Sequence, residues 1–154
     1  MSELELLKEI ERLANKASED ILVCRYLKEE DWDLLSSWWK WWRWSSNNDK
    51  DFFPDNGTCG IMIEKNGTPI VAGFIYYTNS KVALLEWIIS NPRYKQSDRK
   101  QAIELLITEA EQIVKEKGYK YMFSTVRNKH LINTHEKLGW TVDKNPSHEI
   151  TKKL

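Results

Sequence analysis

Glu86 is the residue with the clearest potential for chemistry, because every neighbour but one in the segment Leu84–Ser90 is apolar or aromatic. A carboxylate in such a strand either faces solvent at an alternating position or lies in a cleft. Burial in a cleft would raise its pKa into the range of a general base near neutral pH. Both interpretations stay open from the residues alone, and Glu86 is therefore a candidate catalytic base.

Basic residues follow this strand and precede a long helix. They are Arg93, Lys95, Arg99 and Lys100, in a chain whose 23 basic and 23 acidic residues balance. Positive charge at a helix start opposes the helix dipole, whereas the unpaired N–H groups there suit a phosphate. The segment predicts a site for an anionic ligand, with a plain solvated helix start as the alternative.

Tryptophans are concentrated between Trp32 and Trp44, a segment that holds six of the eight in the chain. On a helix, most of them share one broad stripe, which indicates core packing. Trp41 and Trp44 fall nearer the surface, where aromatic rings beside Lys40 and Arg43 could stack on bases. Core packing and a binding surface both stay open for this helix.

The elements that must position these residues can be predicted from periodicity. Apolar residues at helical spacing predict helices over residues 2–17, from residue 31, over 97–117 and near 130–138. Apolar segments bounded by turn residues predict strands at 21–27, 58–64, 69–77, 82–90, 120–126, 140–142 and 148–152. Asn66-Gly67 predicts a hairpin turn, since both residues tolerate positive φ.

This order predicts an α+β fold, a mixed α/β sandwich. Antiparallel strands followed by one strand–helix–strand crossover give a mostly antiparallel twisted sheet of about seven strands, flanked by helices. At 154 residues we expect a single domain over 1–154, with an N-terminal helix over 1–18 appended to it. That helix could pack on the sheet or frame a homodimer contact.

Composition excludes several classes of function. A net charge of zero provides no global field that would attract nucleic acid or a membrane. No apolar run approaches the ~20 residues that a membrane span needs, and the N-terminal segment is acidic rather than signal-like. Cys24 and Cys59 fit neither a metal site nor a disulfide framework. We therefore expect a cytoplasmic protein with no metal and no membrane partner.

The order of elements from Leu84 to Trp140, closed by the sequence EKLGW at 136–140, resembles the GNAT superfamily of N-acetyltransferases in a divergent form, which could be of phage type. The resemblance implies an enzyme that transfers an acetyl or similar acyl group from acetyl-CoA to an amine, by direct attack in a ternary complex. The acceptor would be a small molecule, a protein or a modified nucleobase.

The resemblance also implies where the donor binds. The family's loop signature, Arg/Gln-x-x-Gly-x-Gly/Ala, aligns with residues 95–100, where Asp98 and Lys100 stand at the two glycine positions. Side chains of Lys95, Arg99 and Lys100 would then hold the pyrophosphate, while Asp98 could instead cap the helix with Gln101. The expected donor-binding residues are Ile88, Ile89, Ser90, Lys95, Gln96, Ser97, Asp98, Arg99, Lys100 and Asn128.

Catalytic and acceptor roles follow from the same resemblance. Asn128 stands seven residues before His135, similar to the family's spacing between a cofactor-contacting Asn and a Tyr that protonates the leaving thiolate. Glu86 would be the base and His135 the acid, unless His135 only lines a packed helix. The family's first helix and following loop shape the acceptor pocket, which implies acceptor contacts from Trp38, Trp41, Trp42 and Phe52.

Two other functions are compatible with the sequence. The glycine-free loop allows a protein of the same fold that uses a non-CoA donor or only binds. The tryptophan-rich helix allows a nucleic-acid or protein binding module, although a neutral chain is not typical of one.

Overall fold

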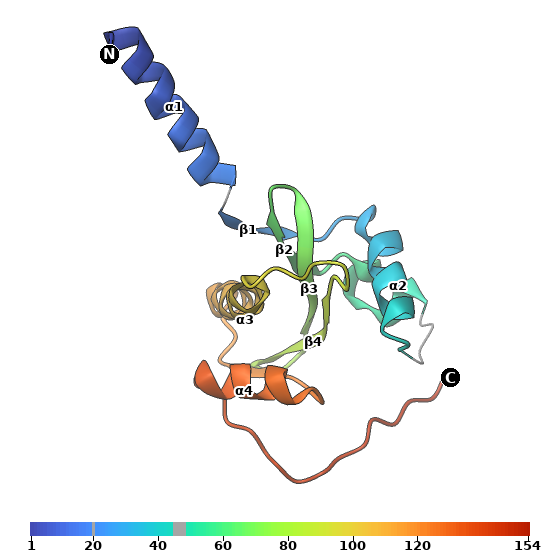
Figure 1. The fold of residues 1–154 in the computed structure, drawn as a ribbon. Coiled ribbons are helices and arrows are strands. Elements are labelled where there is room, and N and C mark those ends of the chain that lie inside the picture. Colours follow the sequence, from blue (N-terminus) through green and yellow to red (C-terminus); the bar gives the residue numbers. More distant parts are fainter. Residues whose placement is uncertain (20, 45–48) are drawn as a thin grey trace.

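The computed structural model describes residues 1–19, 21–44 and 49–154, with side chains for 1–14, 21–44 and 49–154. These residues form four α-helices, two short 3-10 segments and one five-stranded sheet (Figure 1). In chain order the elements are α1 (Glu3–Glu19), β1 (Leu22–Tyr26), α2 (Asp31–Trp41), the 3-10 segments Lys50–Phe52 and Pro54–Gly57, β2 (Gly60–Lys65), β3 (Thr68–Tyr77), β4 (Val82–Ser90), α3 (Arg99–Glu116), β5 (Tyr121–Phe123) and α4 (Lys129–Lys137).

The sheet keeps the order of the chain, β1-β2-β3-β4-β5. Its first four strands are antiparallel neighbours, and β5 pairs parallel to β4 after the α3 crossover. The β2–β3 hairpin turns at Asn66 and Gly67, with φ of 53° and 72°, as the two positive-φ residues of such a turn require. The predicted α+β architecture and the mostly antiparallel sheet are confirmed.

The predicted number of strands, about seven, was too high. Among the described residues the sheet has five strands, and neither 140–142 nor 148–152 joins it. The indole N–H of Trp140 donates to Glu111 on α3, and its ring packs against His135 on α4. The segment after Trp140 therefore forms no ladder with the edge strand β5, and Ile150 is left 92% exposed.

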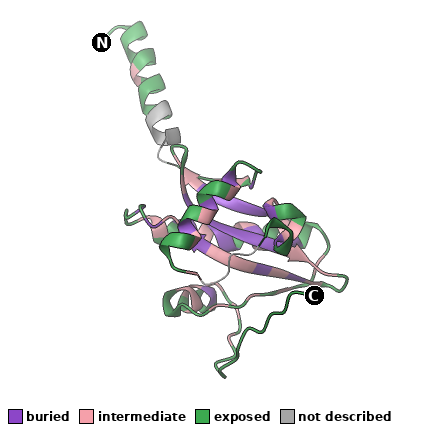
Figure 2. Ribbon diagram, turned by 90° about the vertical axis from the view of Figure 1, so that its right-hand side faces the viewer, coloured by how far each residue is buried: buried purple, intermediate pink, exposed green. Residues whose placement is uncertain are grey.

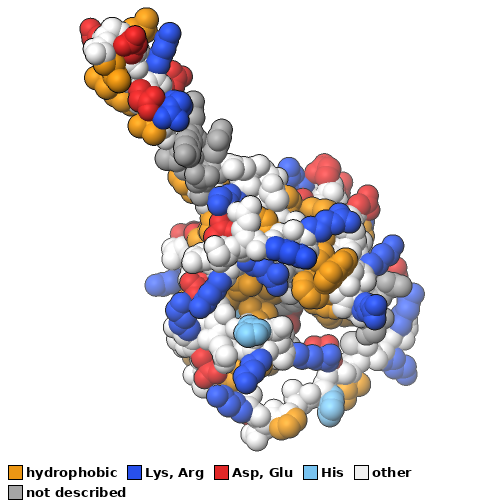
Figure 3. Space-filling view, viewed as in Figure 1, with side chains coloured by type: hydrophobic (Ala, Val, Ile, Leu, Met, Phe, Trp, Pro, Cys, Tyr) orange, Lys and Arg blue, Asp and Glu red, His pale blue; other side chains and the backbone are white. Residues whose placement is uncertain are grey.

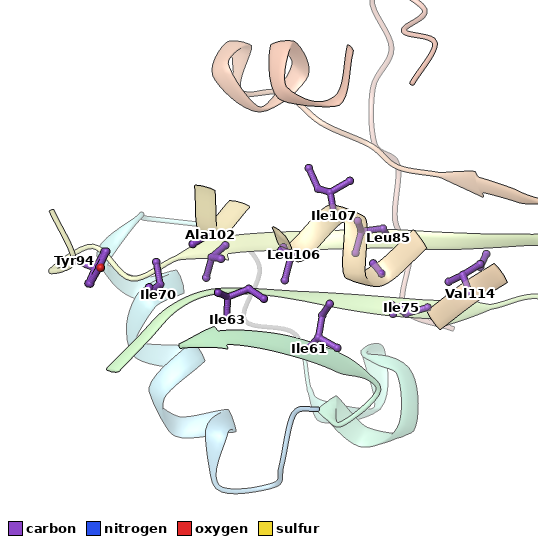
Figure 4. Packing of buried hydrophobic residues seen from close by; sticks show 13 residues of the cluster. Ile61, Ile63, Ile70, Ile75, Leu85, Tyr94, Ala102, Leu106, Ile107 and Val114 are labelled. Carbon is purple, nitrogen blue, oxygen red and sulfur yellow. The ribbon is translucent and has the colours of Figure 1, made fainter. Parts of the chain in front are cut away.

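Apolar side chains fill both faces of the sheet. On one face, β2, β3 and β4 pack against α3, whose buried residues recur at helical spacing: Ala102, Leu106, Ile107, Ala110 and Val114 (Figure 4). On the other face, Leu35 and Trp38 of α2 pack on Phe74 and Ile89. Figure 2 shows the buried residues concentrated in the strands between these two layers.

The strand β4 changes course at Trp87, which has a φ of 58°. Its register with β3 shifts there, so that Glu86 pairs with Phe74 and Ile89 with Ala72. A bulge of this kind bends a strand and re-aims its side chains. The parallel pairing of β4 with β5 ends at Leu84 and Phe123, so the two strands separate just before Glu86.

The helix α1 extends away from the sheet (Figure 1). Its apolar residues Leu6, Leu7, Ile10 and Leu13 are all at least half exposed. No helix in the described ranges is both long enough and apolar enough for a membrane span.

Candidate active site

A cavity of about 1070 Å³ opens where β4 and β5 separate. Its walls come from residues 86–90 of β4, 124–128 after β5, the first turn of α3, one face of α4, the segment after α2 and the C-terminal segment. Figure 3 shows the surface hollowed between the sheet and the C-terminal segment, with Lys and Arg side chains around the hollow. The volume lies at the upper end of the range for small-molecule sites.

Glu86 lies in the wall of this cavity, half-buried on β4. Its Oε1 accepts a 3.0 Å hydrogen bond from the backbone N–H of Thr125, across the gap between the separating strands. Burial raises the pKa of Glu86 to about 7; the Thr125 N–H opposes this rise, and the charge of Glu149 adds to it. A carboxyl with this pKa can accept a proton near neutral pH.

The residues predicted to hold the phosphates divide into two groups. Arg99 and Lys100, in the first turn of α3, line the cavity, and the guanidinium of Arg99 lies over the Trp42 ring at 6.0 Å. The predicted loop residues Lys95, Gln96 and Ser97 are exposed and lie outside the cavity lining. The cavity end beside α3 therefore combines two cations with a helix N-terminus, which suits an anion.

Asp98 is turned away from this cavity end. Its carboxylate accepts hydrogen bonds from the hydroxyl of Tyr94 at 2.6 Å and from Nζ of Lys65 at 2.9 Å. These two partners, Tyr94 first, hold its pKa below the ordinary value. Asp98 occupies the N-cap position of α3, but no side-chain capping bond is present. Its negative charge is thus paired with Lys65 and lies outside the cavity lining.

The strand residues expected to contact the donor are on the cavity wall: Ile88, Ile89 and Ser90 all line it. The Ser90 carbonyl already accepts a 2.9 Å hydrogen bond from the Trp42 indole. Asn128 also lines the cavity, and its Oδ1 caps α4 by accepting from the N–H groups of His130 and Leu131.

His135 is not brought together with the other predicted residues. It is 3% exposed and outside the cavity lining, with Nδ1 2.8 Å from the carbonyl of Leu131 and its ring edge-on to Trp140. Burial lowers its pKa, while the Leu131 carbonyl and the charge of Glu111 act in the opposite direction. The packed-helix alternative describes this geometry better than a proton donor to the cavity.

Of the four residues predicted to contact the acceptor, two line the cavity and two do not. Trp42 and Phe52 line the cavity, whereas Trp38 is buried in the core between α2 and the sheet. Trp41 is 57% exposed and packs edge-on against Trp42, outside the lining.

Several lining residues had no signal in the sequence. Trp87 follows Glu86 in the sequence, and at the bulge both residues line the cavity, whereas neighbours in a regular strand point to opposite faces. The indole N–H of Trp87 donates to the hydroxyl of Tyr76 at 3.0 Å. Glu149 and Thr151 reach the cavity from the C-terminal segment, where Glu149 pairs with Arg127 at 3.2 Å. The pattern of 148–152 predicted a strand, but it gave no indication that this segment would line the cavity.

A second, smaller cavity of about 370 Å³ continues beyond Glu86. The two cavities share six residues: Phe52, Glu86, Trp87, Thr125, Glu149 and Thr151. The smaller cavity adds Tyr76, Leu84, Phe123 and Ile150. Glu86 therefore lies at the junction between a large cavity with a basic end and a small, mostly apolar one. Within the described ranges, no group of three His, Cys, Asp or Glu side chains could hold a metal ion.

Comparisons with known proteins bear on the family and the fold. The model of the acetyltransferase (GNAT) family matches residues 8–140. No curated protein matches the chain in sequence.

Solved structures of acetyltransferases share the fold. An aminoglycoside acetyltransferase from an uncultured soil metagenomic sample, in complex with sisomicin, is 14% identical with a TM-score of 0.58, over 86% of this chain and 97% of that one. The ribosomal-protein-S18-alanine N-acetyltransferase of Escherichia coli is 18% identical with a TM-score of 0.58, over 77% of each chain. N-acetylglutamate synthase of Neisseria gonorrhoeae, complexed with coenzyme A and N-acetyl-glutamate, is 8% identical with a TM-score of 0.59, over 75% of this chain and 28% of that one. At these identities the likeness establishes the fold, and the acceptors of the three proteins differ.

Proposed function

The chain belongs to the GNAT family of acetyltransferases, and we propose that it transfers an acetyl group from acetyl-CoA to a primary amine, with Glu86 as the general base. The observation that carries this proposal is the polarity of the joined cavities. Arg99 and Lys100 line the large cavity alone, whereas Glu86 and Glu149 are the charged residues that line both cavities. An anionic donor and a cationic amine would each be drawn to a different one of these pairs.

The residues that line the large cavity fit acetyl-CoA as the acyl donor. Arg99, Lys100 and the first turn of α3 would hold its phosphates, since the Asp98 carboxylate is occupied by Lys65 and Tyr94. The strand residues Ile88 and Ile89 would lie along its apolar arm. The side chains of Arg99 and Lys100 thus supply the phosphate contacts that the backbone of a glycine-containing loop makes in the family's signature.

When bound, acetyl-CoA supplies a thioester whose carbonyl carbon forms the new C–N bond while its C–S bond breaks and the thiol is released. The residues of the chain supply the proton transfer. Glu86, as a carboxylate, accepts the proton that the amine nitrogen loses, and the Thr125 N–H fixes the orientation of its carboxyl group. His135 is too deeply buried for the acid role, so we assign the proton on the leaving thiol to solvent.

The alternative of a nucleic-acid binding module rests on the exposed rings of Trp41 and Trp42. Most tryptophans of this region pack on one another or on phenylalanines instead, as Trp39 does on Phe53 at 5.0 Å. Trp42 is tied to Ser90 and Arg99 at the cavity. These contacts favour a role in shaping the cavity, and we rank the binding module second.

We also propose that α1 forms a homodimer contact. The exposed apolar stripe of α1 fits a second copy of the same helix. Arg12 already pairs with Glu9 within α1, so the contact rests on the apolar stripe. Ile10→Asp should then halve the mass measured by light scattering, and a monomeric unmodified chain would refute the contact.

Calorimetric titration tests the donor assignment. Acetyl-CoA and coenzyme A should bind at micromolar to low millimolar concentrations, and ATP should bind more weakly because it lacks the arm that would lie along β4. If acetyl-CoA gave no heat and no thermal stabilisation at millimolar concentration, the proposed reaction would have to be abandoned while the fold would stand.

A further inference from the structure

The smaller cavity has walls that are mostly aromatic. Phe52, Tyr76, Trp87 and Phe123 contribute rings to it. Trp87 is fixed in place, since its N–H donates to Tyr76, whose hydroxyl in turn donates to the carbonyl of Phe52. The rings of Phe52 and Trp87 meet edge to face at 5.7 Å. A flat apolar group could pack against these walls in the offset or edge-on geometries that aromatic rings prefer.

Apolar groups at the rim of this cavity are left open to solvent. Phe123 is 59% exposed and Ile150 92% exposed, and Phe52 is also exposed. Scattered exposed apolar side chains are ordinary, but a group of them around one concave site indicates a surface that a ligand covers. The occupant of this cavity should therefore carry an apolar body.

The charged residues of the smaller cavity are both acidic. They are Glu86 and Glu149, and no Lys, Arg or His is among its described lining residues. Arg127 pairs with Glu149 from the side of the larger cavity, whereas the hydrogen-bond partner of Glu86 is the uncharged N–H of Thr125. An ammonium group would be attracted here, and its attraction to ring faces adds to that of the carboxylates. A carboxylate on the ligand would be repelled.

We propose that the acceptor is a primary arylalkylamine: an aromatic ring joined by a short chain to an amino group, without a carboxylate beside that group. Its ring packs against Phe52, Trp87 and Phe123, and its amino group faces Glu86 and Glu149. This inference rests on the proposed function, because that function makes the smaller cavity the acceptor site. It excludes amino acids, whose α-carboxylate would meet the two glutamates, and polyamines, which would leave the rings uncovered.

Equilibrium binding of matched amines tests this proposal without relying on turnover. Calorimetric titration of the full chain with 2-phenylethylamine should give saturable binding about tenfold or more tighter than phenylalanine, which adds only the carboxylate, and than ethylamine, which lacks the ring. Tighter binding of phenylalanine, ethylamine, spermidine or an aminoglycoside would overturn the proposal. So would the absence of saturable binding of 2-phenylethylamine.

Two variants with matched controls locate the binding. Phe123→Ala should weaken 2-phenylethylamine binding about fivefold or more, whereas Tyr121→Ala should not, although both aromatic residues are exposed on β5. Glu149→Gln should weaken it similarly, whereas Asp143→Asn in the same C-terminal segment should not. Equal effects of variant and control would place the amine elsewhere and refute the site.

Titration of the same preparations with acetyl-CoA distinguishes an error in the acceptor class from an error in the reaction. If acetyl-CoA binds and transfer occurs but polar amines are preferred, only the acceptor class is wrong. If acetyl-CoA does not bind, the proposed reaction fails, while the order of amine affinities still decides the preference of the cavity.

Discussion

The carboxylate of Glu86 on β4 accepts a 3.0 Å hydrogen bond from the backbone N–H of Thr125, across the gap between the separating strands β4 and β5. This bond orients a carboxyl group that lines both cavities. Burial raises the pKa of this group to about 7. The proposed chemistry depends on that position.

Turnover should require the ionised form of Glu86. Because its pKa is about 7, kcat/KM should rise with pH along a limb whose midpoint is near pH 7. Glu149→Gln removes a negative charge that raises this pKa, so the midpoint should move to lower pH. Initial rates from about pH 5.5 to 9 measure both profiles, and an unchanged midpoint in the variant would contradict the assignment of the limb to Glu86.

Glu86→Gln should stabilise the fold at alkaline pH. The folded-state pKa lies above the ordinary value of 4.5, so the folded protein binds more protons between about pH 4.5 and 7 and loses stability as pH rises through that window. The neutral variant avoids this loss, which we place on the order of 1 kcal/mol after allowing for solvent exposure. Urea unfolding should show the gain at about pH 8 and none at about pH 4; a pH-independent difference would argue against a raised pKa.

Arg99→Ala and Lys100→Ala should each weaken acetyl-CoA binding by about tenfold, as expected for the loss of one charge-assisted phosphate contact. Lys95→Ala is the matched control, because Lys95 is exposed and outside the cavity lining. Calorimetry measures all three affinities. A larger loss for Lys95 than for Arg99 would return the phosphate site to the loop that precedes α3.

His135→Phe should preserve turnover within about twofold and change mainly the free energy of unfolding, since His135 is buried against Trp140 and outside the cavity. The phenyl ring keeps the packing and removes a polar ring whose Nε2 has no hydrogen-bond partner in the described structure. If turnover instead fell by about two orders of magnitude with normal stability, His135 would be restored as the proton donor.

Local patterns explain how much of the fold could be predicted. Apolar periodicity located α3 within two residues of its start, and Asn66-Gly67 located the hairpin, because both signals depend on neighbours in sequence. The segment 148–152 alternates as a strand does, yet nothing local records that Trp140 turns the chain toward Glu111. Edge strands and their partners depend on such long-range contacts.

Residues of the candidate site were predictable where the sequence of their own strand or helix is unusual. Glu86 and the pair Arg99 and Lys100 were found because an unusual charge stands in an apolar strand or at a helix start. The pairing of Asp98 with Lys65 was not predictable, since Lys65 lies 33 residues away in the sequence. Trp87 and Glu149 were missed for related reasons, because a bulge places the first and a distant C-terminal segment brings the second.

The central claim is most directly tested by comparing the unmodified chain with Glu86→Gln in an assay of amine-dependent thiol release from acetyl-CoA at about pH 8. We predict that the turnover number falls by about 100-fold or more, the usual range for loss of a general base, with an unchanged acetyl-CoA affinity by calorimetry. Glu116→Gln, an exposed residue at the far end of α3, should leave both quantities unchanged. Normal turnover of the Glu86→Gln variant would contradict the account.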